Sequence, residues 1–294
     1  MIVAKTRRDT IFNVCNYILL FLLALICLLP FVHILALSFS SSAAATSGKV
    51  SFWPVDFSLN SYQYTMQNPS FLKAFWVTLQ RVVLGLAIDM AITIFAAYPL
   101  SKTKKEMPGR TPLAWIFVVT MFVGGGMIPS YMVVTATGLR NTLWALILPY
   151  AVKPFNITVL LNFFRQTPKE LEESALIDGA SQMRILMKIY LPLALPALAT
   201  LVVFDTVFHW NEWFSGLIYM DMKANYPLQT YLQGVIINPD FTLMDYNQIE
   251  MMSKISSKTF QSAQIMIATV PILLIYPFLQ KYFVKGLTLG SLKG

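Results

Sequence analysis

Six long apolar stretches, separated by polar segments, constrain the fold of this chain more than any other feature of its sequence. A helix needs about 20 mostly apolar residues to cross the hydrocarbon core of a bilayer, and each stretch is long enough. Helices satisfy their own backbone polar groups there, which irregular segments cannot do. The expected helices cover about 11–39, 71–100, 112–134, 142–164, 193–219 and 263–284. The sequence predicts an all-α integral membrane protein with six transmembrane helices, forming a single transmembrane domain over 1–294.

The composition favours lipid as the solvent for most of the surface. Hydrophobic residues make up 56% of the 294 residues and charged residues only 12%, whereas ordinary soluble domains carry about 25% charged residues. The net charge of +8 would suggest nucleic acid in a soluble protein. Here the basic residues lie in short loops between apolar stretches, so we expect contact with membrane lipid and no nucleic-acid partner.

The first apolar stretch has two interpretations. Arg7 and Arg8 precede it and small residues follow it, as in a cleaved signal peptide. Its run of close to 28 apolar residues exceeds the roughly 7–15 of a signal-peptide core, so we expect an uncleaved first helix. Cys15 and Cys27 are twelve residues apart on this helix, too far to bridge. No internal disulfide is expected.

The distribution of Lys and Arg predicts the orientation, because cytoplasmic loops carry an excess of both. These residues gather before the first stretch, in alternate loops and after the last stretch. They are Lys5, Arg7, Arg8, Lys102, Lys104, Lys105, Arg110, Arg165, Lys169, Arg184, Lys188, Lys281, Lys285 and Lys293. Both termini are therefore expected in the cytoplasm.

Glycine and proline interrupt the third and fourth stretches, at Gly124-Gly125-Gly126, Pro149 and Pro154. Membrane helices tolerate both residues, so these positions are either packing kinks or unwound backbone that lines a cavity. The outer loop 220–262 is too polar to cross a membrane and too long for a turn, so we expect it to form a lobe.

The expected inner loop 165–192 is unlike a short turn. Pro168 suits the start of a helix, and Gly179 suits its end. Acidic residues, which are favourable near a helix N-terminus, follow the proline at Glu170, Glu172 and Glu173. The pattern predicts a short helix over Pro168–Asp178 and a second helical stretch over Gln182–Ile189.

The same loop carries a recognisable spacing. Glu173-Ser174-Ala175 is followed by three residues and Gly179, then by nine residues, Ile189, one residue and Leu191-Pro192. This order resembles the EAA loop of ABC importer permeases, Glu-Ala-Ala, three residues, Gly, nine residues, Ile, one residue, Leu-Pro. Only Ser174 departs from it, one small residue for another, and Asp178 and Ala180 beside the glycine add to the match.

The resemblance extends over most of the chain. The segments TGLRNT, HWNEWF and the terminal YFVKGLTLGSLKG are similar to the carbohydrate-importer branch, in particular the second permease of maltose-type systems. Within that branch the chain looks most like permeases for complex or acidic oligosaccharides, such as alginate importers.

This resemblance implies a type I ABC importer permease in the bacterial cytoplasmic (inner) membrane. The implied partners are a second permease, making a heterodimer, two ATPase subunits, an extracytoplasmic solute-binding protein and an oligosaccharide. The short helix would dock on the ATPase with Glu173 facing an arginine, and the outer loop 220–262 would meet the binding protein. The tail residues Leu287, Leu289 and Leu292 would lie against the ATPase pair.

No catalytic or metal-binding residue is expected in this chain. The sequence lacks the phosphate loop G-x-x-x-x-G-K-[ST] and the metalloprotease motif H-E-x-x-H. ATP and Mg would therefore be bound by the partner ATPase, and the chain itself would need no cofactor.

Ionisable side chains at membrane depth are costly and point to function. Arg81 and Asp89 lie in the second stretch and Lys153 in the fourth. The fifth stretch carries Asp205, His209 and Glu212, spaced i, i+4 and i+7 as on one helix face, flanked by Trp210, Asn211 and Trp213. These residues either form a buried polar network, line a substrate pathway or relay protons, and the two tryptophans are either interfacial or a platform for sugar stacking.

The cations among them suit an acidic oligosaccharide, because a cation offsets part of the dehydration of a carboxylate. Pairing with Asp89, Asp205 or Glu212 would leave no spare charge for solute. The main functional prediction is a permease for oligosaccharides; the alternatives are a permease for another solute and, more distantly, a channel, an ion-driven carrier or a membrane enzyme.

Overall fold

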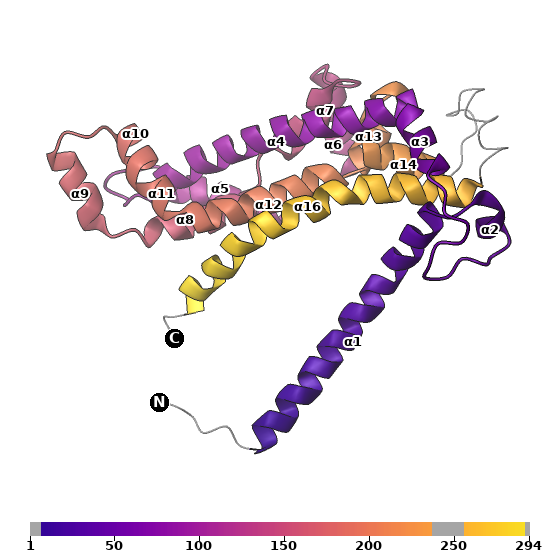
Figure 1. The fold of residues 1–294 in the computed structure, drawn as a ribbon. Coiled ribbons are helices and arrows are strands. Elements are labelled where there is room, and N and C mark those ends of the chain that lie inside the picture. The colour runs from indigo at the N-terminus through magenta and orange to yellow at the C-terminus, as the bar shows by residue number, and fades with distance from the viewer. Residues whose placement is uncertain (1–6, 237–255, 292–294) are drawn as a thin grey trace. The chain divides into compact units, whose positions relative to one another are not determined.

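The computed structural model describes residues 7–236 and 256–291, and every regular element within them is a helix (Figure 1). The chain divides into two compact units. Unit 1 comprises Met1–Pro69 and Gly234–Thr269, and unit 2 comprises Ser70–Gln233 and Val270–Gly294. The expected all-α class is confirmed for the part of the chain that the structure describes.

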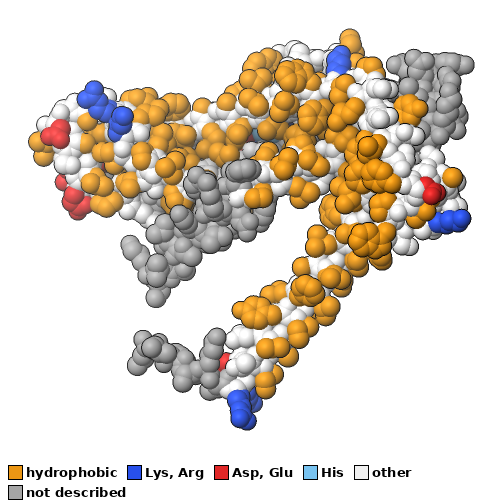
Figure 2. Space-filling view, viewed as in Figure 1, with side chains coloured by type: hydrophobic (Ala, Val, Ile, Leu, Met, Phe, Trp, Pro, Cys, Tyr) orange, Lys and Arg blue, Asp and Glu red, His pale blue; other side chains and the backbone are white. Residues whose placement is uncertain are grey.

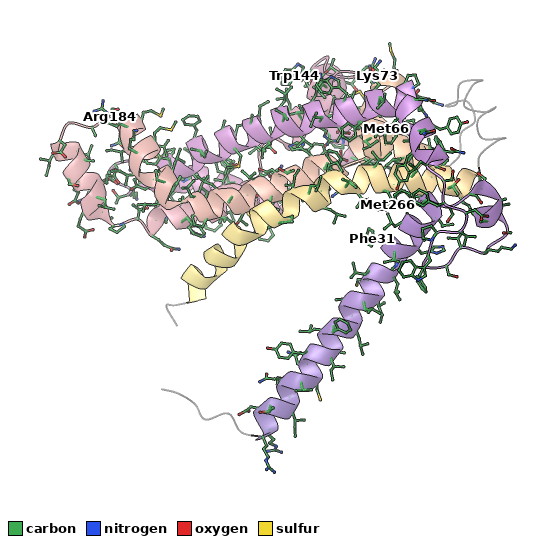
Figure 3. The ribbon with its side chains drawn as sticks, in the orientation of Figure 1. Phe31, Met66, Lys73, Trp144, Arg184 and Met266 are labelled. Atoms are coloured by element: carbon green, nitrogen blue, oxygen red, sulfur yellow. The ribbon has the colours of Figure 1, made fainter. Side chains whose placement is uncertain are left out.

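Unit 1 contains α1 (Arg7–Ser38), α2 (Ser42–Thr46), α3 (Asn60–Gln67) and the beginning of α16 (Ser257–Ser291). The apolar window of α1 is 0% buried, and apolar side chains such as Phe31 project from the helix along its length (Figures 2 and 3). A helix that is apolar on all sides suits lipid or a protein core. A small core forms where α1 ends, from Ala36, Ala44 and Val50.

Unit 2 begins with α4 (Pro69–Ser101), a continuous helix of 33 residues. The elements that follow are α5 (Arg110–Phe122), α6 (Met127–Ala136), α7 (Leu143–Ile147), the 3-10 turn η1 (Leu148–Tyr150), α8 (Pro154–Arg165), α9 (Lys169–Ile177), α10 (Gln182–Ile185), the π-helical turn η2 (Leu186–Tyr190), α11 (Leu191–Leu193), α12 (Leu195–Asn211), α13 (Phe214–Tyr219), the 3-10 turn η3 (Lys223–Asn225) and α14 (Leu228–Ile236). In Figure 1, α4 and α12 run alongside one another, and α9 lies at one end of the unit.

The main core of unit 2 joins α4 and α8 to the segment from α10 to α12. Its buried residues include Tyr98, Leu160, Phe164, Tyr190 and Leu201. On the face seen in Figure 2, the charged side chains of this unit gather mostly at the α9 end, where Figure 3 also labels Arg184. Ala175 of α9 packs against this core, so the core supports α9.

Three described helices are long and apolar enough to cross a membrane, and up to six spans result if each of three bent helix pairs is one span. The bends are 119° between α5 and α6, 51° between the α7–η1 segment and α8, and 81° between the segment Gln182–Leu193 and α12. Broken helices at membrane depth are tolerated where they line a cavity or are buried in protein.

Three of the expected stretches contain helix breaks, and those in the third and fourth lie at the glycines and prolines where an interruption was expected. The third stretch, 112–134, is divided at Gly124-Gly125-Gly126, where Gly126 has a φ of 80° that residues with a Cβ adopt only with strain. The fourth stretch is interrupted before Pro154, and the fifth ends as a helix at Asn211. Three adjacent glycines and a proline each weaken a helix, so the breaks in the third and fourth stretches follow from these residues. The break after Asn211 has no glycine or proline beside it.

Candidate functional site

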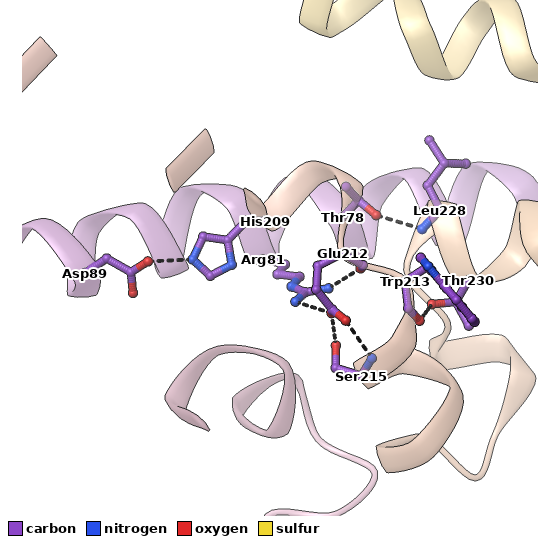
Figure 4. A network of polar contacts seen from close by, with 9 residues as sticks. All are labelled: Thr78, Arg81, Asp89, His209, Glu212, Trp213, Ser215, Leu228 and Thr230. Atoms are coloured by element: carbon purple, nitrogen blue, oxygen red, sulfur yellow. Dashed lines mark hydrogen bonds and ion pairs between the residues drawn. The ribbon is translucent and has the colours of Figure 1, made fainter. Parts of the chain in front are cut away.

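The Arg81 side chain is fully buried on α4 and is neutralised by Glu212. Its Nη2 lies 2.7 Å from Glu212 Oε2, and its Nη1 donates to the Glu212 carbonyl oxygen at 2.7 Å (Figure 4). The backbone N–H of Ser215 donates to the second carboxylate oxygen at 2.9 Å. Because such charge-assisted hydrogen bonds are strong, this pair fixes the segment after α12 against α4.

Glu212 faces α4, as His209 does: Glu212 bonds Arg81 and His209 contacts Asp89, and both partners lie on α4. Glu212 is the first residue beyond α12, and its backbone is extended. The helix ends there, and the turn that follows places the carboxylate beside Arg81. The contacts of His209 and Glu212 with α4 agree with the expected shared face, although Glu212 lies one residue beyond the helix.

A second group of charges surrounds Lys153, which lies in the extended backbone just before α8. Its Nζ is 2.5 Å from Asp89 Oδ2 and 2.8 Å from Asp205 Oδ1. Asn156 donates to Asp205 at 2.8 Å, and His209 Nε2 lies 2.8 Å from Asp89 Oδ2. The group thus connects α4, α8 and α12 through side chains that the sequence placed at membrane depth.

Gly85 allows this approach of α12 to α4. A Cβ at Gly85 would lie 2.6 Å from the His209 ring, far inside van der Waals contact. Glycine at this position therefore lets His209 reach Asp89, which lies one turn further along α4.

A cavity of about 530 Å³ adjoins Lys153. Its walls include the interrupted backbone at Val152 and the aromatic residues Tyr150, Phe155 and Phe208. Lys153 Nζ lies 4.4 Å from the centroid of the Phe208 ring, and the lysine side chain keeps 18% of its surface exposed. The prolines of the fourth stretch therefore mark unwound backbone that lines a cavity, the second of the two interpretations.

The aromatic walls were missed at the level of sequence, because aromatic residues in membrane helices are common and usually pack. Their proximity to a lysine between two prolines was the available signal. Phe208 also packs against Tyr150, with ring centroids 5.3 Å apart.

The two tryptophans lie in different surroundings. Trp210 is buried and packs edge-on against Phe75, with centroids 5.8 Å apart. Trp213 is 39% exposed and packs against Phe214, and Asn211 is exposed. The buried Trp210 offers no open ring face, so a stacking platform at this residue is not supported.

The short helix α9 ends as expected at Gly179. The N–H of Ala180 donates to the Ala175 carbonyl at 2.9 Å, and the N–H of Gly179 donates to the Leu176 carbonyl at 3.0 Å. With a φ of 75° at Gly179, these bonds form a Schellman motif, in which glycine is the preferred left-handed residue. The predicted helix over Pro168–Asp178 is confirmed to within one residue at each end.

The residues of the EAA-like spacing face two directions. Ala175, Ala180, Ile189 and Leu191 pack, partly buried, against the main core. The exposed members are Glu173, Ser174, Asp178, Gly179 and Pro192. Ile177, which the spacing leaves unspecified, is 86% exposed, so α9 presents apolar and acidic groups together.

The tail residues are only partly described. Leu287 and Leu289 belong to α16, whose side chains there are not described, and Leu292 lies outside the described residues. Among the described residues, no group of three His, Cys, Asp or Glu side chains is placed to hold a metal ion.

Glu172 was missed as a site residue at the level of sequence, and the structure buries it at the base of α9. Its carboxylate pairs with Lys102 and accepts a hydrogen bond from the Tyr190 hydroxyl at 2.5 Å. No local signal separates Glu172 from Glu173, because adjacent helical residues can both be exposed, as Glu173 and Ser174 are. Tertiary packing decides which side of α9 is buried.

A smaller cavity of about 260 Å³ lies beside Glu172, with Arg110, Arg165, Glu106 and Glu173 also in its walls. The backbone N–H of Thr103 donates to Glu106 at 2.7 Å. This bond lowers the pKa of Glu106 below its ordinary value, so its carboxylate is charged at neutral pH.

Apolar helices of spanning length, broken helices around a cavity and ion pairs at membrane depth define a helical membrane protein of the transport class. The chain belongs to the family of binding-protein-dependent transport system inner membrane components, whose family model matches residues 1–289.

Three comparisons specify the branch. The chain is 40% identical over 287 residues to the polygalacturonan/rhamnogalacturonan transport system permease protein YtcP of Bacillus subtilis (strain 168), covering 98% of this chain and 100% of that protein. It is 41% identical over 290 residues to protein LplC of the same organism, covering 99% and 97%. A crystal structure of a bacterial ABC transporter involved in the import of the acidic polysaccharide alginate has a chain that matches with a TM-score of 0.88 at 31% identity, covering 95% and 99%.

These matches confirm the resemblance to ABC importer permeases of the carbohydrate branch that the EAA-like spacing indicated.

Proposed function

We propose that this chain is one permease subunit of a binding-protein-dependent ABC importer for oligosaccharides that carry carboxylates. Family membership supports the importer, and the relatives named for polygalacturonan and alginate support an acidic solute. In this proposal the chain crosses the bacterial cytoplasmic (inner) membrane six times, with both termini in the cytoplasm, and forms half of the pathway with a second permease.

The α9 helix is the proposed docking surface for a separate ATPase, which binds ATP and Mg. Its exposed face combines Glu173 with Leu176 and Ile177, and an acidic group beside apolar side chains suits a cleft that offers an arginine. Two ATPase subunits and an extracytoplasmic solute-binding protein complete the proposed complex.

The acidic substrate rests on the relatives named for polygalacturonan and alginate, because Lys153 already pairs with Asp89 and Asp205 and has no unpaired charge to offer a solute. Lys153 is still the cation that borders the proposed solute cavity. It is partly exposed to an aromatic cavity of about 530 Å³, whereas Arg81 is fully buried and paired with Glu212. Aromatic faces beside a cation match a sugar ring that bears a carboxylate. Arg81 and Glu212 thus serve the fold in this proposal, whereas Lys153 both holds Asp89 and Asp205 and borders the cavity.

The test is uptake into vesicles that contain the whole complex, with an oligogalacturonate, an oligoalginate and a neutral maltooligosaccharide as probes. Lys153→Arg retains the charge and Lys153→Met removes it. We expect acidic-sugar uptake to fall about tenfold or more in Lys153→Met, since a desolvated charge-assisted contact contributes roughly 1.5–3 kcal/mol, with basal ATP hydrolysis retained.

Arg140→Met is the matched control, because Arg140 is a partly exposed cation that pairs with Asp221 and lies over the Tyr131 ring. Preferential stimulation of the wild-type complex by the neutral sugar would contradict the acidic substrate. An absence of ATP-dependent uptake of every sugar would contradict the oligosaccharide importer. If Lys153→Met assembles and takes up acidic sugar as the wild type does, Lys153 does not serve the solute. If Lys153→Met is lost from the membrane, Lys153 serves the fold through Asp89 and Asp205.

A further inference from the structure

The base of α9 is held by a set of buried polar contacts, here called the Glu172 cluster: Glu172, Lys102, Tyr190 and Tyr98. The Lys102 and Glu172 side chains are each only 10% exposed and form an ion pair. Tyr190 donates to the second Glu172 oxygen at 2.5 Å. Both carboxylate oxygens are thus used inside this chain, so Glu172 has no free oxygen to offer another protein.

Lys102 is enclosed by aromatic rings as well as by the carboxylate. Its Nζ lies 4.2 Å from the Tyr98 ring centroid and 4.6 Å from the Tyr190 ring centroid, close enough for cation–π attraction. Tyr98 also donates to Gln182 Oε1 at 2.6 Å, and Arg110 donates to the Lys102 carbonyl at 2.5 Å. The Glu172 cluster therefore ties α9 to the end of α4 and, through these neighbours, to α5 and α10.

Two features place the cluster where α9 could act on α4. Tyr190 is the last residue of the π-helical turn η2, and such turns are frequent at functional sites. Lys102 directly follows α4, and the same helix carries Asp89 and Arg81 towards its other end. Lys102 thus lies just beyond the end of the helix that carries both ion pairs, with Pro99 of α4 between Lys102 and Asp89.

We propose that the Glu172 cluster transmits the movement of α9 to α4, and thereby to the ion pairs of Asp89 and Arg81. Glu172, Lys102 and Tyr190 are positioning residues in this role, whereas the adjacent Glu173 is exposed and meets the ATPase. The proposal rests on the proposed function of α9 as the docking helix. It adds that docking and coupling depend on different, neighbouring glutamates.

The experiment measures ATP hydrolysis and solute uptake on the same vesicles and reports their ratio. Glu172→Gln, Lys102→Met and their combination disrupt the cluster, and Glu170→Gln is the matched control, an exposed acid on the same helix. We expect Glu172→Gln and Lys102→Met each to raise the ATP hydrolysed per solute about threefold or more, because each removes a charge-assisted bond. The double variant should be no worse than the more severe single variant, as contacting residues are not additive.

Tyr190→Phe is the milder variant, because it removes only the hydroxyl that donates to Glu172 and keeps the ring beside Lys102. We expect the ratio to rise in this variant while the ATPase co-purifies in wild-type amount. An unchanged ratio in Tyr190→Phe and Glu172→Gln, or hydrolysis and uptake that fall in equal proportion, would overturn the proposal. If the complex with Glu172→Gln does not assemble, the ratio of ATP hydrolysed to solute taken up by the Tyr190→Phe complex decides whether the proposal holds. Failure of the proposed function would appear earlier, as a wild-type complex without ATP-dependent uptake.

Discussion

Two arginines of this chain show that burial determines how much an ion pair contributes to the stability of the fold. Arg81 is fully buried and bonds both the carboxylate and the carbonyl of Glu212. Arg140 pairs with Asp221, but their side chains are 43% and 49% exposed. Removing one partner of a buried pair leaves an uncompensated charge, whereas a hydrated pair loses little when one partner is removed.

Arg81→Met should therefore destabilise the subunit by about 3–5 kcal/mol, as for other broken buried pairs. The measurement is the thermal unfolding midpoint of the purified protein in detergent, together with its amount in the membrane. Arg140→Met, the control, should change stability by no more than about 1 kcal/mol. Equal midpoints for the two variants would show that Arg81 is not held as described.

The sequence predicted which charged residues are buried at membrane depth, but it did not predict their ion-pair partners. The cost of burial picked out Arg81, Asp89, Lys153 and Asp205 from residue type and depth alone. Their partners could not be predicted, because Arg81 and Glu212 are 131 residues apart and the helix break after Asn211 decides where Glu212 points. Sequence also did not separate Glu172 from its neighbour, since the inward direction of α9 depends on tertiary packing.

The short helix α9 owes its ends to local chemistry and its position to distant residues. Pro168 precedes it, and the Schellman motif at Gly179 closes it. Both features are local, and the positions of Pro168 and Gly179 in the sequence predicted them. The contacts of Glu172 with Lys102 and Tyr190, which hold the helix in place, join residues from three separate segments.

Gly179→Val should weaken assembly with the ATPase. A Cβ at Gly179 would meet nothing within 4 Å, so the cost comes from the left-handed backbone alone, about 1–2 kcal/mol. Asparagine adopts this conformation more readily, and Gly179→Asn should retain most assembly. The measurement is the amount of ATPase recovered with the tagged permease and the hydrolysis rate of the complex. Equal recovery for both variants would exclude a role for the backbone at Gly179.

The buried charges of unit 2 are paired, whereas much of the apolar surface of α1 is exposed. These charges find counter-charges within unit 2, while α1 leaves its apolar surface uncovered by this chain. The expected outer lobe is only partly described: α14 lies within it, but 237–255 and with it Tyr246 lie outside the described residues. Its proposed meeting with a binding protein therefore stays a prediction.

Truncation after Lys285 tests the proposed contact of the tail with the ATPase pair. The cut removes the final helical residues of α16, which ends at Ser291, and leaves its apolar window, Lys258–Ile275, intact. We expect solute-stimulated ATP hydrolysis to fall while the amount of subunit in the membrane stays constant. Wild-type turnover by the truncated complex would contradict a contact at Leu287 and Leu289.

The sequence separation of Arg81 and Glu212 has a consequence for how the chain is made. Ribosomes add roughly 5–20 residues per second, so the 131 residues between the two positions take on the order of ten seconds to synthesise. During that interval the guanidinium of α4 has emerged and its carboxylate does not yet exist. A newly made α4 thus lacks the counter-ion that the finished fold supplies, and the machinery that inserts the nascent chain has to accommodate that charge until translation passes Glu212.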